Sequence, residues 1–225
     1  MRTLACTVVF LGPSLDSNEA ATHLQARYLP PIRRGDLPTV IADGARFIGI
    51  VDGEFGQSLA VSVMEVCSGL KQGVQIWGAA SMGALRAAEC QSMGMVGVGW
   101  IFQKYVEGSL RADDEVALLF DPRSRRATTI PLVNVRWALQ VAIEEGMIPG
   151  SSEAVLIEFA RTVRFADRTY QSLLEATSGS PFKEEMRTLV EFMKRDPLRT
   201  DRKRLDALLL LDRMQESISL LNRVS

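Results

Sequence analysis

Short apolar runs alternate with amphipathic stretches along the first half of the chain. Residues 6–11, 47–51 and 74–77 are runs that are apolar on both faces, and a glycine-containing turn follows each of them. Such runs, separated by helical stretches, are typical of buried strands in a parallel sheet. We therefore predict an α/β fold with a mostly parallel sheet, Rossmann-like or hydrolase-like, in the N-terminal half.

Helical periodicity fills the intervals between these runs and dominates the second half of the chain. The helices expected from it cover residues 16–27, 37–41, 61–71, 98–106, 135–145, 151–164, 181–194 and 201–218. Residues 116–120 are expected to form a further strand, with 127–130 as its hairpin partner. We accordingly expect an α/β core domain at residues 1–130. A helical C-terminal region at 131–225 is expected to be packed on the core or appended to it.

The segment at residues 76–90 combines a buried strand, a turn of small residues and a helix. Ser81 lies at the turn, with Ala79 two residues before it and Gly83 two residues after it. This spacing is that of a nucleophile elbow, G-x-S-x-G, with alanine in place of the first glycine. Such a turn presents the hydroxyl at the sheet edge, where the N-terminus of the next helix stabilises an oxyanion. The alternative is structural, because small residues also let a helix pack closely on a sheet.

The turns after the three apolar runs are expected at the same edge of the sheet. In open α/β sheets the carboxyl ends of the strands carry the site. We therefore predict one pocket there, with the hydroxyl of Ser81 exposed in it. The residues expected to form the pocket and the oxyanion site are Gly12, Ser14, Asp52, Gly78, Met82 and Gly83.

The composition and charge of the chain argue against several kinds of function and site. Hydrophobic residues make up 47% of the chain, enough for a sizeable core, and the formal net charge of −1 argues against nonspecific nucleic-acid binding. Cys6, Cys67 and Cys90 form no CxxC pair, so we expect buried thiols in a reducing cytosol and no metal site. A single histidine, His23, excludes a Ser-His-Asp triad unless His23 itself serves. No apolar run has the length of a membrane span, so a cytoplasmic protein is expected.

Several segments together resemble the TfuA family. The segments that carry the resemblance are residues 9–15, 30–31, 34–36, 52–53, 78–89, 94–99, 105, 108 and 113–117. They cover roughly the first 120 residues, and the block around Ser81 is specific to the family. The C-terminal helices contribute little to the resemblance.

The resemblance implies a partner of YcaO-type enzymes, the ATP-dependent cyclodehydratase homologues that activate a peptide amide. TfuA-type proteins support the exchange of the amide oxygen for sulfur in a ribosomally synthesised peptide. The resemblance implies a hydrolase that cleaves the thiocarboxylate of a ThiS-like sulfur-carrier protein and releases sulfide beside YcaO. It also implies help with binding of the precursor peptide. No cofactor, membrane or nucleic acid is expected.

The family is described as using a Ser–Lys pair, and Ser81 matches the family serine. The lysine has no clear match, because Met64 stands beside Glu65 where the family pattern has a lysine. Lys71 is expected at the far end of the same helix, about 20 Å from Ser81. Lys104 lies on the next helix, which returns toward the site, and is therefore the predicted base. The alternative is that Lys104 is simply an exposed lysine on the helix surface. A lysine base must be neutral, which needs burial or a nearby cation.

Two charged groups complete the candidate residues. Arg86 and Glu89 are spaced to pair on one helix face and, with Glu65, are expected to support the site or to form a structural ion pair. The acidic run 113–115 is expected to be a solvated loop, with a metal or a basic partner as the alternative.

Three functions stay open from the sequence. The first is a serine hydrolase acting on a thiocarboxylate. The second is a noncatalytic adaptor that improves binding of peptide or sulfur donor by YcaO. The third is an α/β protein that binds a small anion or a nucleotide at the helix N-terminus after Ser81, and it ranks last because the chain lacks the glycine-rich nucleotide motifs.

Overall fold

The computed structural model describes residues 6–56 and 58–224, which form two compact units. One unit comprises Met1–Arg111 with Lys203–Ser225, and the other comprises Ala112–Arg202. The ranges expected from the sequence differ from these units in two places. Residues 112–130 lie in the second unit, and the last helix of the chain lies in the first.

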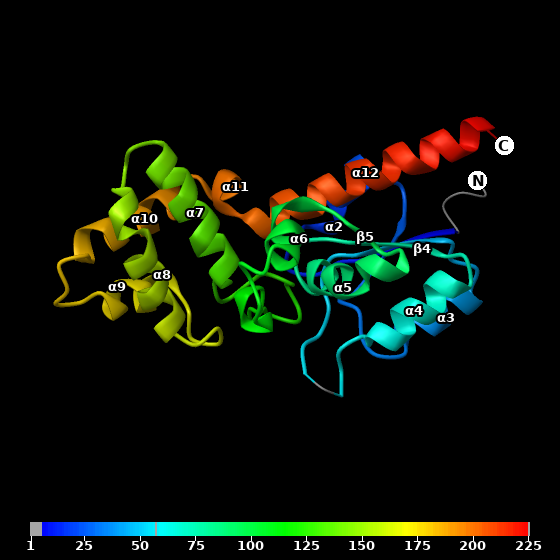
Figure 1. Cartoon of the computed structure of the whole chain (residues 1–225), viewed down its shortest axis with the longest axis horizontal. Coiled ribbons are helices and arrows are strands. Elements are labelled where there is room, and N and C mark those ends of the chain that lie inside the picture. Colours follow the sequence, from blue (N-terminus) through cyan, green and yellow to red (C-terminus); the bar gives the residue numbers. More distant parts are fainter. Residues whose placement is uncertain (1–5, 57, 225) are drawn as a thin grey trace. The chain divides into compact units, whose positions relative to one another are not determined.

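A five-stranded parallel sheet forms the centre of the first unit (Figure 1). Its strands are β1 (Thr7–Phe10), β2 (Arg27–Leu29), β3 (Phe47–Ile50), β4 (Gln75–Gly78) and β5 (Val96–Gly97). They are ordered β2-β1-β3-β4-β5, and every neighbouring pair is parallel. The predicted α/β fold with a mostly parallel sheet is thus confirmed. In this order the switch point, where ligands bind in open α/β sheets, lies between β1 and β3.

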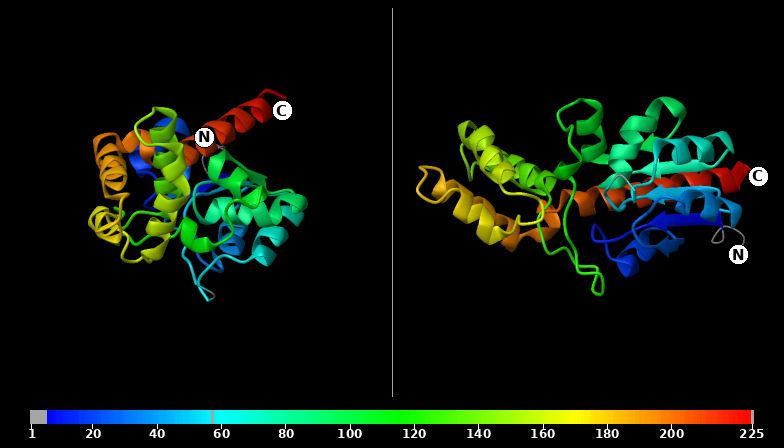
Figure 2. Two further views of the ribbon diagram at one scale, coloured as in Figure 1. Left: turned by 60° about the vertical axis from the view of Figure 1, so that its left-hand side comes forward. Right: turned by 90° about the horizontal axis from the view of Figure 1, so that it is seen from below.

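Helices cover both faces of this sheet, as the two views of Figure 2 show. They are α2 (Ser17–His23), α3 (Asp36–Ala42), α4 (Val63–Lys71), α5 (Met82–Cys90), α6 (Gly99–Val106) and α12 (Arg202–Val224). Side chains of α2 and α12 share one apolar cluster with β1, so these two helices cover the same face. The packing of α12 is close, because a Cβ on Gly49 of β3 would lie 2.9 Å from Met214 Sδ.

The second unit is helical. It contains α7 (Leu132–Glu144), α8 (Glu153–Thr162), α9 (Tyr170–Ala176), α10 (Lys183–Arg195) and α11 (Pro197–Thr200). One apolar cluster joins α7 to α10, and the fully buried Arg168 donates hydrogen bonds to the Ala160 and Val163 carbonyls at the end of α8. No helix among the described residues is long and apolar enough to cross a membrane.

The prediction that residues 116–120 and 127–130 form the two strands of a hairpin is wrong. Only an isolated antiparallel bridge joins Phe120 to Ala127. The reason is local: the Leu119 amide donates to the side-chain hydroxyl of Thr129 at 2.8 Å, and a side-chain acceptor cannot continue a backbone ladder. The short strands β2 and β5 were not predicted, because two or three residues are too few for a period to show.

Candidate functional site

The loop after β1 wraps around a carboxylate that follows β3. Asp52 is 2% exposed, and its Oδ2 accepts hydrogen bonds from the amides of Gly12 (2.9 Å) and Ser14 (3.0 Å). The Ser14 hydroxyl donates to Oδ1 at 2.6 Å. Glycine is required at position 12, because a Cβ there would lie 2.5 Å from Pro31 Cγ. The expected meeting of the β1 and β3 ends is therefore present, at the switch point of the sheet.

Lys203, in the first turn of α12, brings a cation to the same carboxylate. Its Nζ lies 3.7 Å from Asp52 Oδ1, and the two side chains are 2% and 3% exposed. Charges so thoroughly removed from water are found in proteins mainly when they are paired. The sequence analysis missed Lys203, because it lies in an amphipathic helix far from Asp52 along the chain. A lysine on the apolar side of that helix was the available signal.

A second buried charge on α12 fixes the start of α6. The fully buried Asp206 accepts hydrogen bonds from the amides of Trp100 (3.1 Å) and Ile101 (2.8 Å). A carboxylate is stabilised at a helix N-terminus, where free amides and the positive end of the helix dipole meet. Gly99 has φ +95°, and a Cβ there would lie 2.3 Å from Asp206 Cγ. Lys203 and Asp206 lie three residues apart on α12, and both contact groups at the carboxyl edge of the sheet.

Ser81 lies in the sharp turn between β4 and α5, and its backbone contacts that of Val51, the residue before Asp52. Its amide donates to the carbonyls of Ala79 (2.8 Å) and Val51 (3.3 Å). The positive φ of this turn, 64°, belongs to Ala80 and not to the serine. A left-handed alanine is strained, which is what a tight strand-to-helix turn imposes. The Ser81 side chain makes no capping hydrogen bond to α5.

The glycines on either side of this turn are required by close packing. A Cβ on Gly78 would lie 2.1 Å from the Gly83 carbonyl oxygen, and a Cβ on Gly83 would lie 1.7 Å from the Ile50 oxygen. Helix α5 therefore rests directly on the backbone of β3 and β4. At Gly78 and Gly83, therefore, a small residue is needed because it lets the helix pack closely on the sheet.

The expectation of an exposed Ser81 is wrong, because Ser81 is only 2% exposed. Ala207 of helix α12 packs in one apolar cluster with Val51, Ala79 and Ala80, so α12 covers the residues just before Ser81. Since Ala207 lies one turn after Lys203 on the same face of α12, the contact also brings Lys203 to the end of the sheet that holds Ser81.

The lysines considered from the sequence lie at the surface. Lys104 pairs with Glu107 at 2.8 Å, and its side chain is 31% exposed. Its ammonium also lies 5.8 Å from the centre of the Trp100 ring. Lys71 is exposed at the end of α4, as expected. The role of Lys104 as a base stays a prediction.

Glu65 and Arg86 hold neighbouring segments together. Glu65 completes a capping box with Ser62 at the start of α4, and its Oε1 accepts the Gly35 amide at 2.5 Å. Burial raises the pKa of Glu65, but hydrogen bonds from Ser62 and Gly35 outweigh burial, so the net shift is downward. Arg86 pairs with Glu89 at 2.5 Å and donates to the Val61 carbonyl at 2.7 Å. The predicted pair of Arg86 and Glu89 is present as an ion pair.

Met82, the first residue of α5, forms part of a wall beside the turn. A Cβ on Gly53 would lie 2.7 Å from Met82 Cγ and 2.9 Å from Ile32 Cγ2. Ile32 and Gly53 also form an isolated parallel bridge. The segments after β2 and β3 therefore close directly over the start of α5.

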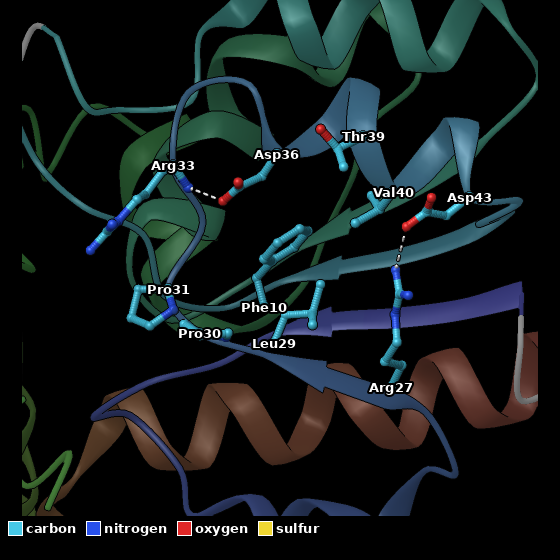
Figure 3. Close-up of a pocket in the computed structure, with 10 residues that line it drawn as sticks. All are labelled: Phe10, Arg27, Leu29, Pro30, Pro31, Arg33, Asp36, Thr39, Val40 and Asp43. Atoms are coloured by element: carbon cyan, nitrogen blue, oxygen red, sulfur yellow. Dashed lines mark hydrogen bonds and ion pairs between the residues drawn. The ribbon is translucent and has the colours of Figure 1, made fainter. Parts of the chain in front are cut away.

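A pocket of about 440 Å³ lies beside this edge, between β1, β2 and α3 (Figure 3). Phe10, Leu29 and Val40 supply apolar surface, and an ion pair of Arg27 with Asp43 (3.5 Å) lies at one end. The other lining residues are Pro30, Pro31, Arg33, Asp36 and Thr39. Because Pro31 also abuts Gly12, one wall of the pocket lies against the loop that holds Asp52. The sequence did not predict this pocket.

The remaining candidates have structural partners. His23 lies 2.7 Å from Asp212 Oδ1 on α12. The expected solvated loop at 113–115 is a 3-10 turn, and Glu115 is buried against Arg136 at 2.7 Å. Within the residues that the structure describes, no group of three His, Cys, Asp or Glu side chains could hold a metal ion.

The fold and the edge together define a doubly wound α/β protein with a serine turn, a buried carboxylate and a buried lysine at the carboxyl end of its sheet. The chain belongs to the TfuA-like family, whose model, described as TfuA-like protein, matches residues 52–169. TfuA-like proteins are associated with YcaO-type systems, and membership supports a role in thioamidation. The match includes Asp52, Ser81 and Lys104, whereas Gly12 and Lys203 lie outside it. No curated protein matches the chain.

Proposed function

We propose that the protein releases sulfide for YcaO-dependent thioamidation by hydrolysing a thiocarboxylated ThiS-like carrier protein, with Ser81 as the nucleophile. The observation that carries the proposal is the buried pair of Lys203 and Asp52 at the end of the sheet that holds the Ser81 turn. A Ser–Lys mechanism needs a lysine near its serine, and Lys203 is a buried lysine at the edge of the sheet where the Ser81 turn lies. We therefore propose Lys203 as the base, in place of Lys104.

The reaction divides into two steps. The step requires Lys203 first to lose its ammonium proton. The Ser81 oxygen then bonds to the thiocarboxylate carbon while the neutral Lys203 amine takes the hydroxyl proton, and the C–S bond breaks as that proton passes to the departing sulfur. Water next attacks the Ser81 ester, its proton passing through Lys203, and the carrier leaves with an ordinary carboxylate. One thiocarboxylate and one water thus give one carboxylate and one hydrogen sulfide.

The start of α5 supports the oxyanion in this proposal. The sequence predicts Gly83 as part of the oxyanion site, but the Gly83 amide donates to the Val51 carbonyl at 3.3 Å. The Ala84 amide donates to the Ser81 carbonyl at 3.0 Å. We therefore propose the Met82 amide, with the positive end of the α5 dipole, as the donor to the oxyanion.

The pocket beside β2 provides a place for the end of the carrier. A C-terminal thiocarboxylate on an extended tail has to reach the edge of the sheet, and the pocket reaches that edge at Pro31. Its apolar floor and polar ends suit a few extended residues. Replacing the exposed Thr39 with tryptophan fills the pocket, so Thr39→Trp should raise KM for the carrier and leave kcat within about twofold.

A second function is favoured by the burial of Ser81. An adaptor that helps YcaO bind its peptide needs no accessible nucleophile, and Ser81 is 2% exposed. The adaptor and the hydrolase differ in what happens without YcaO. An adaptor releases no sulfide from the carrier but still improves thioamidation by YcaO when free sulfide is supplied.

The test incubates the protein with thiocarboxylated carrier and follows sulfide release, with wild type and Ser81→Ala side by side. We expect release by wild type and a loss of at least about 10³-fold in Ser81→Ala, because the variant lacks the nucleophile but keeps a small residue at the turn. Equal release by the two proteins at equal folded concentration would exclude Ser81. No release by wild type, together with improved thioamidation, would support the adaptor.

A further inference from the structure

A stripe of exposed side chains runs along helix α12, outside the apolar cluster that the helix forms with the sheet. It begins at Leu209, which is 37% exposed, and ends at Leu220, which is 63% exposed. Arg213 and Glu216 lie between the two leucines, and both of their side chains are mostly exposed. Because spacings of four, three and four residues fall on one face of a helix, these four side chains form one stripe about 17 Å long, the α12 stripe. The left view of Figure 2 shows that the C-terminal turns of α12 project beyond the rest of the first unit.

The α12 stripe is complementary to a second copy of itself. When two copies of the helix lie antiparallel, with a two-fold axis midway between Arg213 and Glu216, each Leu209 lies level with Leu220 of the second copy. Each Arg213 then lies level with Glu216 of the second copy, so opposite charges meet twice. A parallel pair would instead place arginine beside arginine and glutamate beside glutamate, which repel. The charges therefore favour the antiparallel pair, in which every contact occurs twice, as a two-fold symmetric interface requires.

An antiparallel pair also improves the surroundings of these charges. Within one chain Arg213 Nη1 lies 3.0 Å from Glu216 Oε2. An ion pair so exposed to water contributes little to stability. Between two copies the leucines lie on either side of the charged residues and exclude water from them, which strengthens the attraction between opposite charges. Association thus buries apolar surface that is exposed in the single chain and gives each charge a further partner.

We propose that the α12 stripe is a dimerisation surface and that its partner is a second copy of this chain in antiparallel orientation. The stripe spans only about three helical turns, so the interface is small and a dissociation constant in the micromolar range is expected. The buried side of α12, which holds Lys203, is not used. The proposal is therefore independent of the chemistry at Ser81.

Sedimentation of the whole chain at concentrations from about 1 to about 500 µM tests the dimer. We expect the average mass to rise from that of one chain toward that of two. Leu220→Lys places a charge against a leucine of the second copy and should weaken the dimer by at least about tenfold. Leu198→Lys, which replaces an exposed leucine of α11, is the matched control and should dimerise as wild type does. A wild type that stays monomeric over this range, or equal dimerisation of Leu220→Lys and wild type, would overturn the proposal.

Charge reversal tests whether the charged residues face each other across the pair. Arg213→Glu makes the stripe wholly acidic and Glu216→Arg makes it wholly basic, so each variant alone should stay monomeric. A mixture of the two variants brings opposite charges together and should form heterodimers. Arg187→Glu reverses the arginine of another exposed pair, that with Glu184 on α10, and should dimerise as wild type does. Dimerisation of Arg213→Glu alone at the wild-type level, or a mixture that stays monomeric, would contradict the proposed interface.

Discussion

The ammonium of Lys203 lies 3.7 Å from the carboxylate of Asp52, and both side chains are almost completely buried at the carboxyl edge of the sheet. The pair joins the last helix to the loop after β3, and through Gly12 and Ser14 to the loop after β1. Helix α12 is therefore part of the candidate site and not an appendage to it.

Removing the cation from this pair should destabilise the fold. Lys203→Met leaves the Asp52 carboxylate buried without its cation, which we expect to cost about 3–5 kcal/mol of unfolding free energy. Urea denaturation followed by circular dichroism measures the loss. The double variant with Asp52→Asn removes both charges and should be more stable than Lys203→Met alone. A single variant within 1 kcal/mol of wild type would show that the pair is unimportant for stability.

The contact between Asp206 and α6 should also be measurable. Asp206→Ala removes two hydrogen bonds from the amides of Trp100 and Ile101, so we expect a loss of about 1–3 kcal/mol. Asp212→Ala, on the exposed side of the same helix, is the control and should change stability by less than about 0.5 kcal/mol. Equal effects of the two substitutions would contradict a specific capping role for Asp206.

The close packing of α5 on the sheet predicts that Gly83 cannot be replaced by a larger residue. Gly83→Ala places a methyl group 1.7 Å from the Ile50 carbonyl oxygen, so helix and sheet must separate, and we expect the protein to be insoluble or destabilised by more than about 3 kcal/mol. Gly150→Ala, where the nearest atom would be 3.7 Å away, should fold normally. Soluble expression and melting temperature compare the two. A Gly83→Ala protein as stable as wild type would contradict the close contact.

The capping box of α4 should give stability a pH dependence. The hydrogen bonds from Ser62 and Gly35 lower the pKa of Glu65 below 4.5 in the folded state despite partial burial, which acts in the opposite direction. A lowered folded pKa means stability that is complete above the unfolded pKa and is lost as pH falls through the folded value. Glu65→Gln should therefore be less stable than wild type at pH 7 by about 1 kcal/mol, with the difference shrinking below pH 4. A difference that grows on acidification would contradict this assignment.

Much of the first unit could be predicted because its central strands, β1 and β3, are largely buried on both faces. The runs that became β1, β3 and β4 are mostly apolar, and the turns after β1 and β3 do meet, at Gly12 and Asp52. The turn at Ser81 was recognisable because its small residues stand between a strand and a helix. The sequence gives no measure of burial, however, and so Ser81 was expected to be exposed.

The rest depended on contacts between distant segments. Lys203 and Asp206 are ordinary charged residues of an amphipathic helix until the packing of α12 buries them against the sheet. Periodicity identifies the buried face of a helix, but it does not say which element that face will contact.

The most direct test of the account compares the two candidate lysines in one assay of sulfide release from thiocarboxylated carrier. Lys203→Met and Lys104→Met are measured at equal folded concentration, with Lys71→Met as the control for loss of an exposed lysine. We expect Lys203→Met to lose at least about 10²-fold in kcat, while the other two stay within about twofold of wild type. Wild-type release by folded Lys203→Met, with the loss appearing in Lys104→Met instead, would contradict the central claim that the buried lysine of α12 serves Ser81.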